Sequence, residues 1–429
     1  MRPDLSRNAN YFIIFSVLFT ARAYYPVLAI LFLDLGLSLD QFVFLNLIWA
    51  ATIFLFEVPT GALADTVGRR TLLIMASLLM IVEMLCLLLA PRYGGGLLLA
   101  LCVVNRVCSG LSEACASGAD EALAYDSLPE EGRTAAWDHL LARAMRWRAL
   151  GFVVAMIIGG LLYDSRVINY CLPDDWQLAE SLVHSLPVAL VFCQALVCLL
   201  FAFRMVEPAH PTRGSPLGEV VRLTLATARW ALGNPRIVST LLIGVAIDSI
   251  VRNFATINSS YFRLIELPEW SYGFIGAGMG VLGWFVPGAA KKLNAHFGLL
   301  TNLGLIALCT LAGLAALLPA WPVWGVLPAA FLMAMMGFLA FTVSRVLHQE
   351  ADSSRRATVL SLKGLVFNLG YGIFSLGFSG LLASFSDTPA GASLRNALVW
   401  QLVFFAGLIL GLFVWAAIYL RRKSMIEDA

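Results

Sequence analysis

Charged residues are scarce in this sequence. Only 13% of its 429 residues are Asp, Glu, Lys or Arg, whereas about a quarter of the residues of a soluble protein are charged. Hydrophobic residues make up 60%, and the mean hydropathy is +0.82. This composition excludes a soluble protein. One membrane-spanning helix requires ~20 apolar residues, so the chain is long enough to contain many such helices.

Several functional motifs are also missing. Lysine occurs only at four positions, and no basic run carries interleaved aromatic residues, which argues against nucleic acid as a partner. The eight cysteines show neither C-x-x-C nor a metal-ligand spacing, so we expect no disulfide and no bound metal. No G-x-x-x-x-G-K-[ST], H-E-x-x-H or G-x-S-x-G occurs. We therefore predict no catalytic residue, no direct use of ATP and no cofactor.

Twelve apolar segments are long enough to span a bilayer. Each is predicted to be helical, because unpaired backbone groups are too costly in hydrocarbon. The first segment continues to about Leu33, which is too long for the apolar part of a cleaved signal peptide. The segments cover residues 10–33, 41–62, 71–90, 97–121, 142–163, 182–203, 237–262, 271–290, 299–318, 322–344, 358–383 and 396–420.

Basic side chains are unevenly distributed between the two sets of loops. With the N-terminus placed inside, eighteen Lys and Arg residues lie in or beside the cytoplasmic loops, and four lie on the opposite side. Positive charge favours the cytoplasmic side of a membrane. We therefore expect a multi-pass protein of the bacterial inner membrane with both termini in the cytoplasm.

The longest stretch without a span is polar, contains proline and lies in the middle of the chain. It predicts an N-terminal six-helix bundle over residues 1–203, a cytoplasmic linker over 204–236 and a C-terminal six-helix bundle over 237–429. Apolar residues recur every four positions from Leu217, which predicts an interfacial helix in the linker. Two such halves are typical of transporters that rock around a central site.

The charged sequence GALADTVGRR joins the second and third spans. Gly61 and Gly68 permit a tight turn, and Arg69 and Arg70 can anchor that turn at anionic head groups. One interpretation is therefore a simple cytoplasmic turn. The full pattern, with Asp65, resembles the G-x-L-A-D-x-x-G-R-R signature of the major facilitator superfamily. The preceding FEVPT resembles the sequence found there in the drug/proton antiporter-like branches.

This resemblance implies a major facilitator fold, which is an all-α membrane protein with twelve transmembrane helices in two six-helix bundles. It also implies that Asp65 holds the two halves together at the cytoplasmic side, beside the start of span eleven, when the protein faces outward. We expect Glu57, one turn from Gly61, to extend this gate. Asp120 and Asp126 are expected to join it by pairing with nearby arginines.

Span four contains the most charge. Arg106, Gly110, Glu113, Ser117 and Asp120 fall on one helical face, which predicts a surface toward the bundle interior or an aqueous cavity. The sequence RVCSG is similar to the R-x-x-x-G motif of the superfamily, which is associated there with proton coupling. Arg106 and Glu113 are therefore candidates for proton coupling or substrate binding, with Glu113 first. The alternative is that they neutralise each other or a neighbour.

Other charged residues lie inside spans, where each costs on the order of 2.5 kcal/mol or more. Arg22 is a functional candidate, since a charge near mid-depth recurs in span seven. There Asp248 and Arg252 are four residues apart and are expected to neutralise each other. Glu83 is either a proton site or a residue that faces a neighbouring helix.

A basic set comprises His139, Arg143 and Arg146 on one face of span five, together with Lys363 in span eleven. These side chains either snorkel to the interface or line the cytoplasmic half of the cavity, where they would suit anions. The sequence AMIIGG lacks the Gly-Pro of the G-P-x-x-G-G motif of antiporters. That departure weakens the antiport assignment without removing it.

Together these patterns predict a monomeric secondary transporter that exchanges protons for a small organic molecule, in the outward direction, by alternating access. One alternative is uptake or facilitated transport of an anionic metabolite. Another is a non-transporting receptor or assembly factor built on a transporter scaffold. The expected partners are a small-molecule substrate, protons and membrane lipid, and neither the charges nor the aromatic residues select one substrate.

Overall fold

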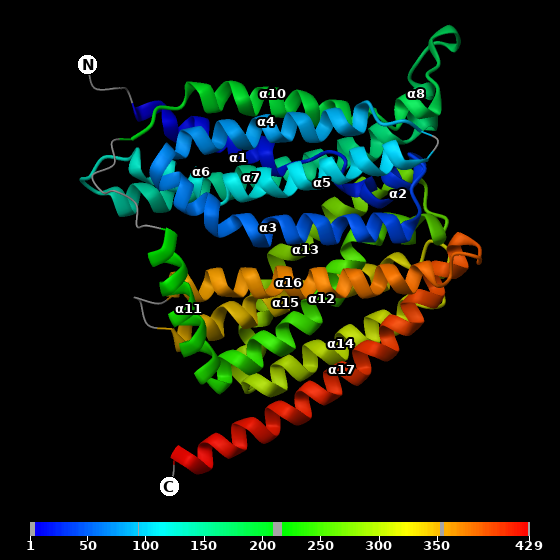
Figure 1. Ribbon diagram of the computed structural model, residues 1–429. Coiled ribbons are helices and arrows are strands. Elements are labelled where there is room, and N and C mark those ends of the chain that lie inside the picture. Colours follow the sequence, from blue (N-terminus) through cyan, green and yellow to red (C-terminus); the bar gives the residue numbers. More distant parts are fainter. Residues whose placement is uncertain (1–4, 93, 209–216, 352–355, 428–429) are drawn as a thin grey trace. The chain divides into compact units, whose positions relative to one another are not determined.

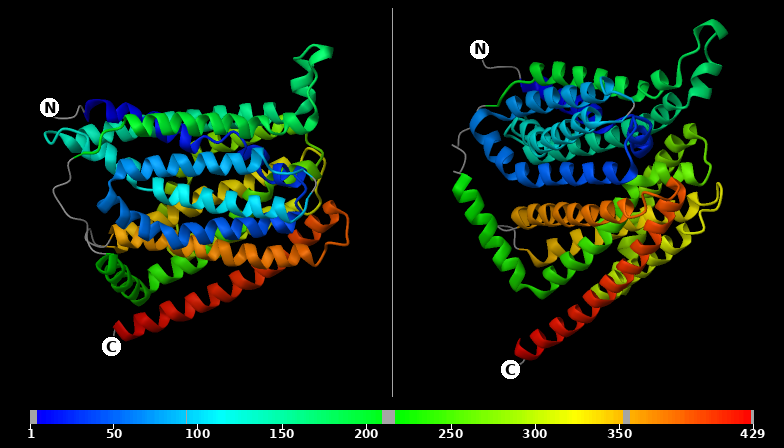
Figure 2. Two further views of the ribbon diagram at one scale, coloured as in Figure 1. Left: turned by 45° about the horizontal axis from the view of Figure 1, so that its top comes forward. Right: turned by 45° about the vertical axis from the view of Figure 1, so that its right-hand side comes forward.

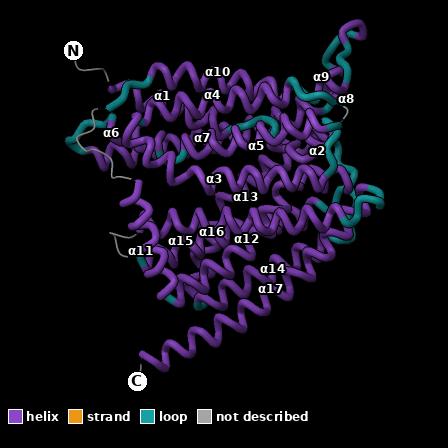
Figure 3. The backbone as a smooth tube through the Cα atoms, in the orientation of Figure 1, coloured by secondary structure: helices purple, strands orange, loops and turns teal. Residues whose placement is uncertain are grey.

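The structure is a computed structural model that describes residues 5–92, 94–208, 217–351 and 356–427. Every regular element in this part of the chain is a helix, and Figure 3 shows helices joined by loops. Among the described residues, twelve helical segments are long and apolar enough to cross a membrane. The all-helical, multi-pass architecture expected from the composition is therefore present.

The spans lie where the apolar segments predicted them, although the fifth begins well before residue 142. Their bounds are Asn8–Asp34, Leu39–Glu57, Arg69–Leu88, Gly96–Asp126, Arg133–Tyr163, Glu180–Arg204, Pro235–Leu264, Glu269–His296, Leu299–Leu317, Val326–Glu350, Leu362–Ala383 and Gly391–Tyr419.

Contacts divide the chain into two units, and unit 1 comprises Met1–Ser38, Ile48–Leu217 and Pro268–Gly280. Within it α4 packs against α5 and α10, which run alongside it in Figures 1 and 2. Its helices, with most of α3, are η1 (Leu5–Arg7), α1 (Asn8–Thr20), η2 (Tyr25–Val27), α2 (Leu28–Asp34), α3 (Leu39–Val67), α4 (Arg69–Leu88), α5 (Gly96–Ala116), α6 (Ala119–Asp126), α7 (Arg133–Tyr163), α8 (Ser165–Tyr170), η3 (Asp174–Trp176), α9 (Glu180–Val183) and α10 (Leu186–Arg204).

Unit 2 comprises Leu39–Leu47, Gly218–Leu267 and Val281–Ala429. Its central helix is α12, whose apolar window is 78% buried, whereas that of the last span is only 17% buried. The helices are α11 (Leu217–Gly233), α12 (Pro235–Leu264), α13 (Glu269–His296, shared between the units), α14 (Leu299–Leu317), α15 (Val326–Glu350), α16 (Arg356–Ala383) and α17 (Ala390–Glu427).

The linker forms a helix, α11, as the spacing from Leu217 predicted. The side chains of Leu217, Val221 and Leu225, on which its amphipathic character depends, lie outside the part that the structure describes. Its placement at the membrane surface therefore stays a prediction.

The first span is not one continuous helix. α1 ends at Thr20, and regular helix resumes with η2 at Tyr25. Pro26 explains the interruption, because proline has no N–H to donate to the carbonyl four residues earlier, and its ring clashes with that carbonyl. The carbonyl four residues before Pro26 belongs to Arg22, and it accepts the Tyr25 N–H at 3.2 Å instead.

Glycine lets α7 lie directly against this break. A Cβ added at Gly159 would be 1.7 Å from the carbonyl oxygen of Ala23, far closer than two such atoms can approach. The glycine pair of AMIIGG thus has a packing role, since Gly159 brings the α7 backbone onto the interrupted part of the first span.

Replacing Gly159 with Ala should therefore destabilise the protein. Overpacking typically costs about 1–3 kcal/mol, and we expect a lower thermal midpoint for the purified protein in detergent. The matched control is Gly407→Ala on α17, where an added Cβ meets no atom of the described chain within 4 Å. There alanine should be neutral or stabilise the helix by up to about 1 kcal/mol. Equal midpoints for the two variants would contradict the close approach at Ala23.

Candidate functional site

A buried ion pair lies at the break in the first span. Arg22 Nη1 donates to Glu83 Oε1 at 2.7 Å and to Oε2 at 2.8 Å, and the two side chains are 1% and 0% exposed. Removing a charge from water is costly unless a partner compensates it. Arg22 and Glu83, which the sequence indicated as separate candidates, therefore form one site.

Neighbouring groups add to the hydrogen bonding of the pair. The Tyr24 hydroxyl donates to Glu83 Oε1 at 3.0 Å, and Arg22 Nε donates to the carbonyl of Phe19 at 3.4 Å. The Asn105 amide donates to the backbone carbonyl of Glu83 at 2.8 Å. Three segments, the break, α4 and α5, are thus joined at one residue, Glu83.

Arg106 has a different environment. Its Cζ atom lies 4.5 Å from the centroid of the Phe32 ring, and the residue is 5% exposed. Its Nε and Nη2 atoms have no hydrogen-bond partner among the described residues. A buried donor left unpaired costs about 1–3 kcal/mol, so Arg106 is able to bind an additional oxygen ligand. Its observed contact is with Phe32, which differs from the pairing with Glu113 considered from the sequence.

Glu113 on α5 is exposed and lies near the ion pair. It interacts electrostatically with Arg22 and with Glu83. Glu57, half-buried on α3, interacts with Glu113 in the same way, and within the described part of the chain its Oε2 atom has no hydrogen-bond partner. Glu57, Glu113 and the ion pair therefore lie close enough to influence one another's charge.

The polar face expected along span four is interrupted. α5 ends before Ser117, whose ψ of 114° lies outside the helical region, and α6 begins after Gly118. The prediction that Asp120 continues the face of Arg106 is therefore wrong. Asp120 instead lies 3.8 Å from Arg148, a residue that the sequence analysis did not single out.

The sequence GALADTVGRR is almost entirely helical. α3 continues through Gly61 to Val67 and α4 begins at Arg69, so Gly68 alone makes the turn, with φ of +94°. A role for Gly61 in the turn is wrong, because the helix simply continues through it. The side chain of Asp65 lies outside the described residues, and its role as a latch stays a prediction.

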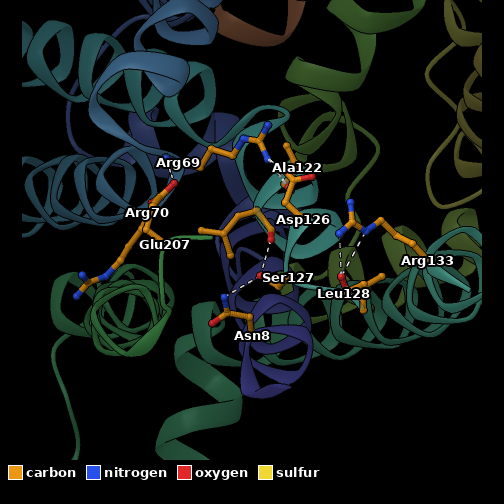
Figure 4. Close-up of polar contacts among 10 residues, drawn as sticks. Asn8, Arg69, Arg70, Ala122, Asp126, Ser127, Leu128, Arg133 and Glu207 are labelled. Atoms are coloured by element: carbon orange, nitrogen blue, oxygen red, sulfur yellow. Dashed lines mark hydrogen bonds and ion pairs between the residues drawn. The ribbon is translucent and has the colours of Figure 1, made fainter. Parts of the chain in front are cut away.

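Glu207, which follows α10, caps the N-terminus of α4 (Figure 4). Its two carboxylate oxygens accept the backbone N–H groups of Arg69 at 2.9 Å and Arg70 at 2.7 Å. The first N–H groups of a helix lack partners within the helix and carry partial positive charge, so this end favours a carboxylate. The sequence analysis missed Glu207, and its position just after span six, at the end where α4 begins, was the available signal.

The arginine side chains of the turn bind protein oxygens. Arg69 Nη1 donates to the Ala122 carbonyl at 2.7 Å and pairs with Asp126, one of the pairings considered from the sequence (Figure 4). Arg70 Nη2 donates to the Phe203 carbonyl at 2.8 Å. These contacts differ from the anchoring to head groups that we expected, because the acceptors belong to unit 1 itself.

A second link at this end involves the start of α1. The Asn8 side-chain amide donates to Ser127 Oγ at 2.8 Å and to the Val206 carbonyl at 2.7 Å. Its oxygen accepts the Val206 N–H at 3.0 Å. Asn8 therefore joins the beginning of unit 1, the end of α6 (Figure 4) and the segment that carries Glu207.

Unit 2 contains its own ion pair on α12. Arg252 Nη2 lies 2.7 Å from Asp248 Oδ2, as the four-residue spacing predicted. Arg252 Nη1 also donates to Asn368 Oδ1 at 2.9 Å, and its Cζ lies 5.3 Å from the centroid of the Tyr371 ring. The arginine therefore connects α12 to α16.

The predicted basic set divides into two environments. His139, Arg143 and Arg146 are exposed on the first half of α7, whereas Lys363 is half-buried on α16. The Lys363 Nζ atom lies 5.5 Å from the centroid of the Phe367 ring. A role for these residues in lining a cavity stays a prediction.

A family model matches most of the chain, over residues 11–359, and its description is Major Facilitator Superfamily. The chain belongs to this superfamily. The matched range contains both GALADTVGRR and RVCSG. As a member of the Major Facilitator Superfamily, the chain is a multi-pass membrane protein of a transporter family, and an enzymatic activity is not expected of it.

Solved structures share the fold of this superfamily member at low sequence identity. A bacterial homologue of the human lysosomal transporter Spinster, inward-facing and unoccupied, is 15% identical with a TM-score of 0.71 and 98% coverage of both chains. The nucleoside transporter NupG is 9% identical with a TM-score of 0.73, covering 96% of this chain and 99% of its own. A D-xylose–proton symporter is 14% identical with a TM-score of 0.64, and the match covers 94% of this chain and 97% of the symporter. No curated protein matches the sequence.

Replacing Glu207 with Ala should destabilise this superfamily member. The change removes the acceptors of two α4 amides, and loss of a helix cap typically costs about 0.5–2 kcal/mol. We expect a lower thermal midpoint, with Glu207→Gln in between because its amide oxygen still accepts one bond. The control is Glu131→Ala, an exposed residue before α7. A midpoint for Glu207→Ala equal to that of this control would argue against the cap.

The ion pair predicts a strong dependence between two substitutions. Arg22→Met leaves the Glu83 carboxylate buried without its cation, which typically costs about 3–5 kcal/mol, whereas replacing both charges with apolar residues is often nearly neutral. Thermal unfolding should therefore show a large loss for Arg22→Met and a recovery for the double variant Arg22→Met/Glu83→Met. Additive losses would mean that the two residues do not act as a pair.

Proposed function

We propose that this superfamily member is a secondary transporter that moves a small organic molecule outward across a bacterial inner membrane, in exchange for protons. Membership in a transporter family supports transport, and the FEVPT sequence supports a place in the drug/proton antiporter-like branch. The working unit is a monomer surrounded by membrane lipid.

The observation that carries this proposal is the position of Glu113. It is an exposed carboxylate whose charge interacts over a short range with a fully buried ion pair. Without a proton, Glu113 competes with Glu83 for the positive charge of Arg22. With a proton bound, this competition ends and the pair of Arg22 and Glu83 is strengthened.

The break in the first span converts this change of charge into a change of structure. Transporter sites commonly lie at discontinuous helices near the middle of the membrane, and Arg22 lies in such a break. A proton shifts a conformational equilibrium only if the two conformations bind it with different affinity. We assign that difference to the strength with which Arg22 is held by Glu83.

Alternating access requires two bodies and a gate. We propose the bundles 1–203 and 237–429, joined by the linker 204–236 with α11, and cytoplasmic termini as the distribution of basic residues indicates. The gate is assigned to the end of unit 1 where α3 meets α4. Its proposed members are Gly61, Asp65, Gly68, Arg69, Arg70, Glu57, Asp120 and Asp126.

A second candidate function is uptake or facilitated transport of an anionic metabolite. Arg106 favours it, since two of its nitrogens lack partners in the described chain and a carboxylate or phosphate group would satisfy them. The direction of flux, and its response when the proton gradient is collapsed, separate this candidate from outward exchange with protons.

Glu113→Gln should abolish proton coupling and leave the fold intact, because glutamine keeps the size of the side chain and cannot take up the proton. The assay uses vesicles that contain the reconstituted protein and a trapped pH indicator, challenged with lipophilic cations, organic anions and sugars. With a transported compound, we expect proton movement to fall at least about tenfold while the thermal midpoint is unchanged. A loss of 1.4 kcal/mol of coupling already corresponds to a factor of ten.

The control for this assay is Glu130→Gln, since Glu130 is an exposed carboxylate in the turn before α7. It should behave as the unmodified protein does. Full coupling in Glu113→Gln would show that the proton binds elsewhere. Binding of compounds, detected as a raised thermal midpoint, without any flux would favour the non-transporting receptor instead.

A further inference from the structure

Unit 2 contains an apolar groove between α12, α16 and α17. Its volume is about 680 Å³, within the range of roughly 300–1,000 Å³ that is typical of small-molecule sites. In Figures 1 and 2, α16 and α17 meet at their connecting turn and diverge away from it. Phe374 and Phe378 of α16 and Trp400 and Phe404 of α17 are among the lining residues. These walls suit an apolar ligand.

Two polar side chains interrupt this lining, Ser249 on α12 and Gln401 on α17, which are 4% and 2% exposed. Gln401 Nε2 donates to the Ile250 carbonyl at 3.4 Å, which identifies the other end of the amide as its oxygen. That oxygen and the Ser249 hydroxyl have no hydrogen-bond partner among the residues that the structure describes. Each such buried group costs about 1–3 kcal/mol when it is left unpaired.

The depth of these groups restricts what can pair with them. Gln401 lies four residues from the midpoint of the 29-residue span Gly391–Tyr419, which corresponds to about 6 Å at ~1.5 Å per residue. The hydrocarbon core of a bilayer is about 30 Å thick, so Gln401 lies well inside it. A phospholipid head group stays at the surface, and an acyl chain has no donor. Ordinary lipid therefore fills the groove without satisfying the amide oxygen.

We propose that this groove binds a compact, lipophilic molecule that carries a hydroxyl or N–H donor within its apolar body. The donor binds Gln401 Oε1, and the Ser249 hydroxyl forms a second hydrogen bond to the same polar group. The site is separate from the charges of unit 1 and takes an uncharged ligand, so it goes beyond the proposed exchange of protons for a substrate.

The test uses two photoreactive probes that differ by one donor. The first is a dialkylated phenol that carries a diazirine, and the second is its methyl ether. Each is irradiated with the full-length protein in lipid nanodiscs, and labelled peptides are identified by mass spectrometry. We expect the phenol to label α12, α16 and α17 with an affinity about three- to tenfold higher than that of the ether, as one hydrogen bond allows.

Two substitutions test the position and the chemistry of the site. Gln401→Leu should lower phenol labelling to the level of the ether and leave ether labelling unchanged, which also shows that the variant is folded. Gly377→Leu should abolish labelling by both probes, because Gly377 lines the groove and an added Cβ meets no described atom within 4 Å. The matched control is Gly380→Leu, which has the same space and lies outside the lining residues.

Equal labelling by the phenol and the ether, unchanged in Gln401→Leu, would overturn the proposal and leave the groove as a place for lipid chains. Labelling that persists in Gly377→Leu would place the probes elsewhere. Absence of both probes from the three helices, with two protein chains found in each nanodisc by native mass spectrometry, would overturn it as well and mean that a second copy covers the groove.

Discussion

The arrangement of the helices around Arg22 in unit 1 depends on the free-energy cost of an unpaired charge in hydrocarbon. Arg22 is tolerated within the first span because its Nη1 donates to the Glu83 carboxylate and to the Tyr24 hydroxyl, at the place where Pro26 interrupts the helix. Gly159 is required beside it for a steric reason, since α7 passes directly against the backbone at Ala23. The break, the ion pair and the close helix contact therefore lie together at one place in unit 1.

The features that could be predicted from the sequence depend on local spacing. A run of about twenty apolar residues has one stable solution in a membrane, so all twelve spans could be located, and the interval of four places Asp248 beside Arg252. The turn at Gly68 could be located for a similar reason. The extent of α3 could not, because GALADTV contains enough good helix formers to continue the helix that precedes it.

The features that could not be predicted depend on residues far apart in the chain. Arg22 and Glu83 are 61 positions apart, and nothing near either residue indicates the other. Glu207 and Arg69 are 138 positions apart, and a glutamate after a span resembles any surface charge. The break between α5 and α6 could not be recognised because the polar residues from Arg106 to Asp120 are spaced as on one face of a continuous helix. These features are determined by the packing between helices, and that packing cannot be read from the spacing of residues along the chain.

The capping of α4 by Glu207 also has a consequence for the order in which the protein is made. Chains emerge from the ribosome with the N-terminal part first, so the amides of Arg69 and Arg70 precede their acceptor by well over one hundred residues. The delay is longer still for Asn8, because its partner Val206 is synthesised 198 residues later. Both contacts close with the same short segment, only when all six helices of the N-terminal half have been synthesised. The contacts of that segment therefore cannot form until the last helix of the N-terminal half has been synthesised.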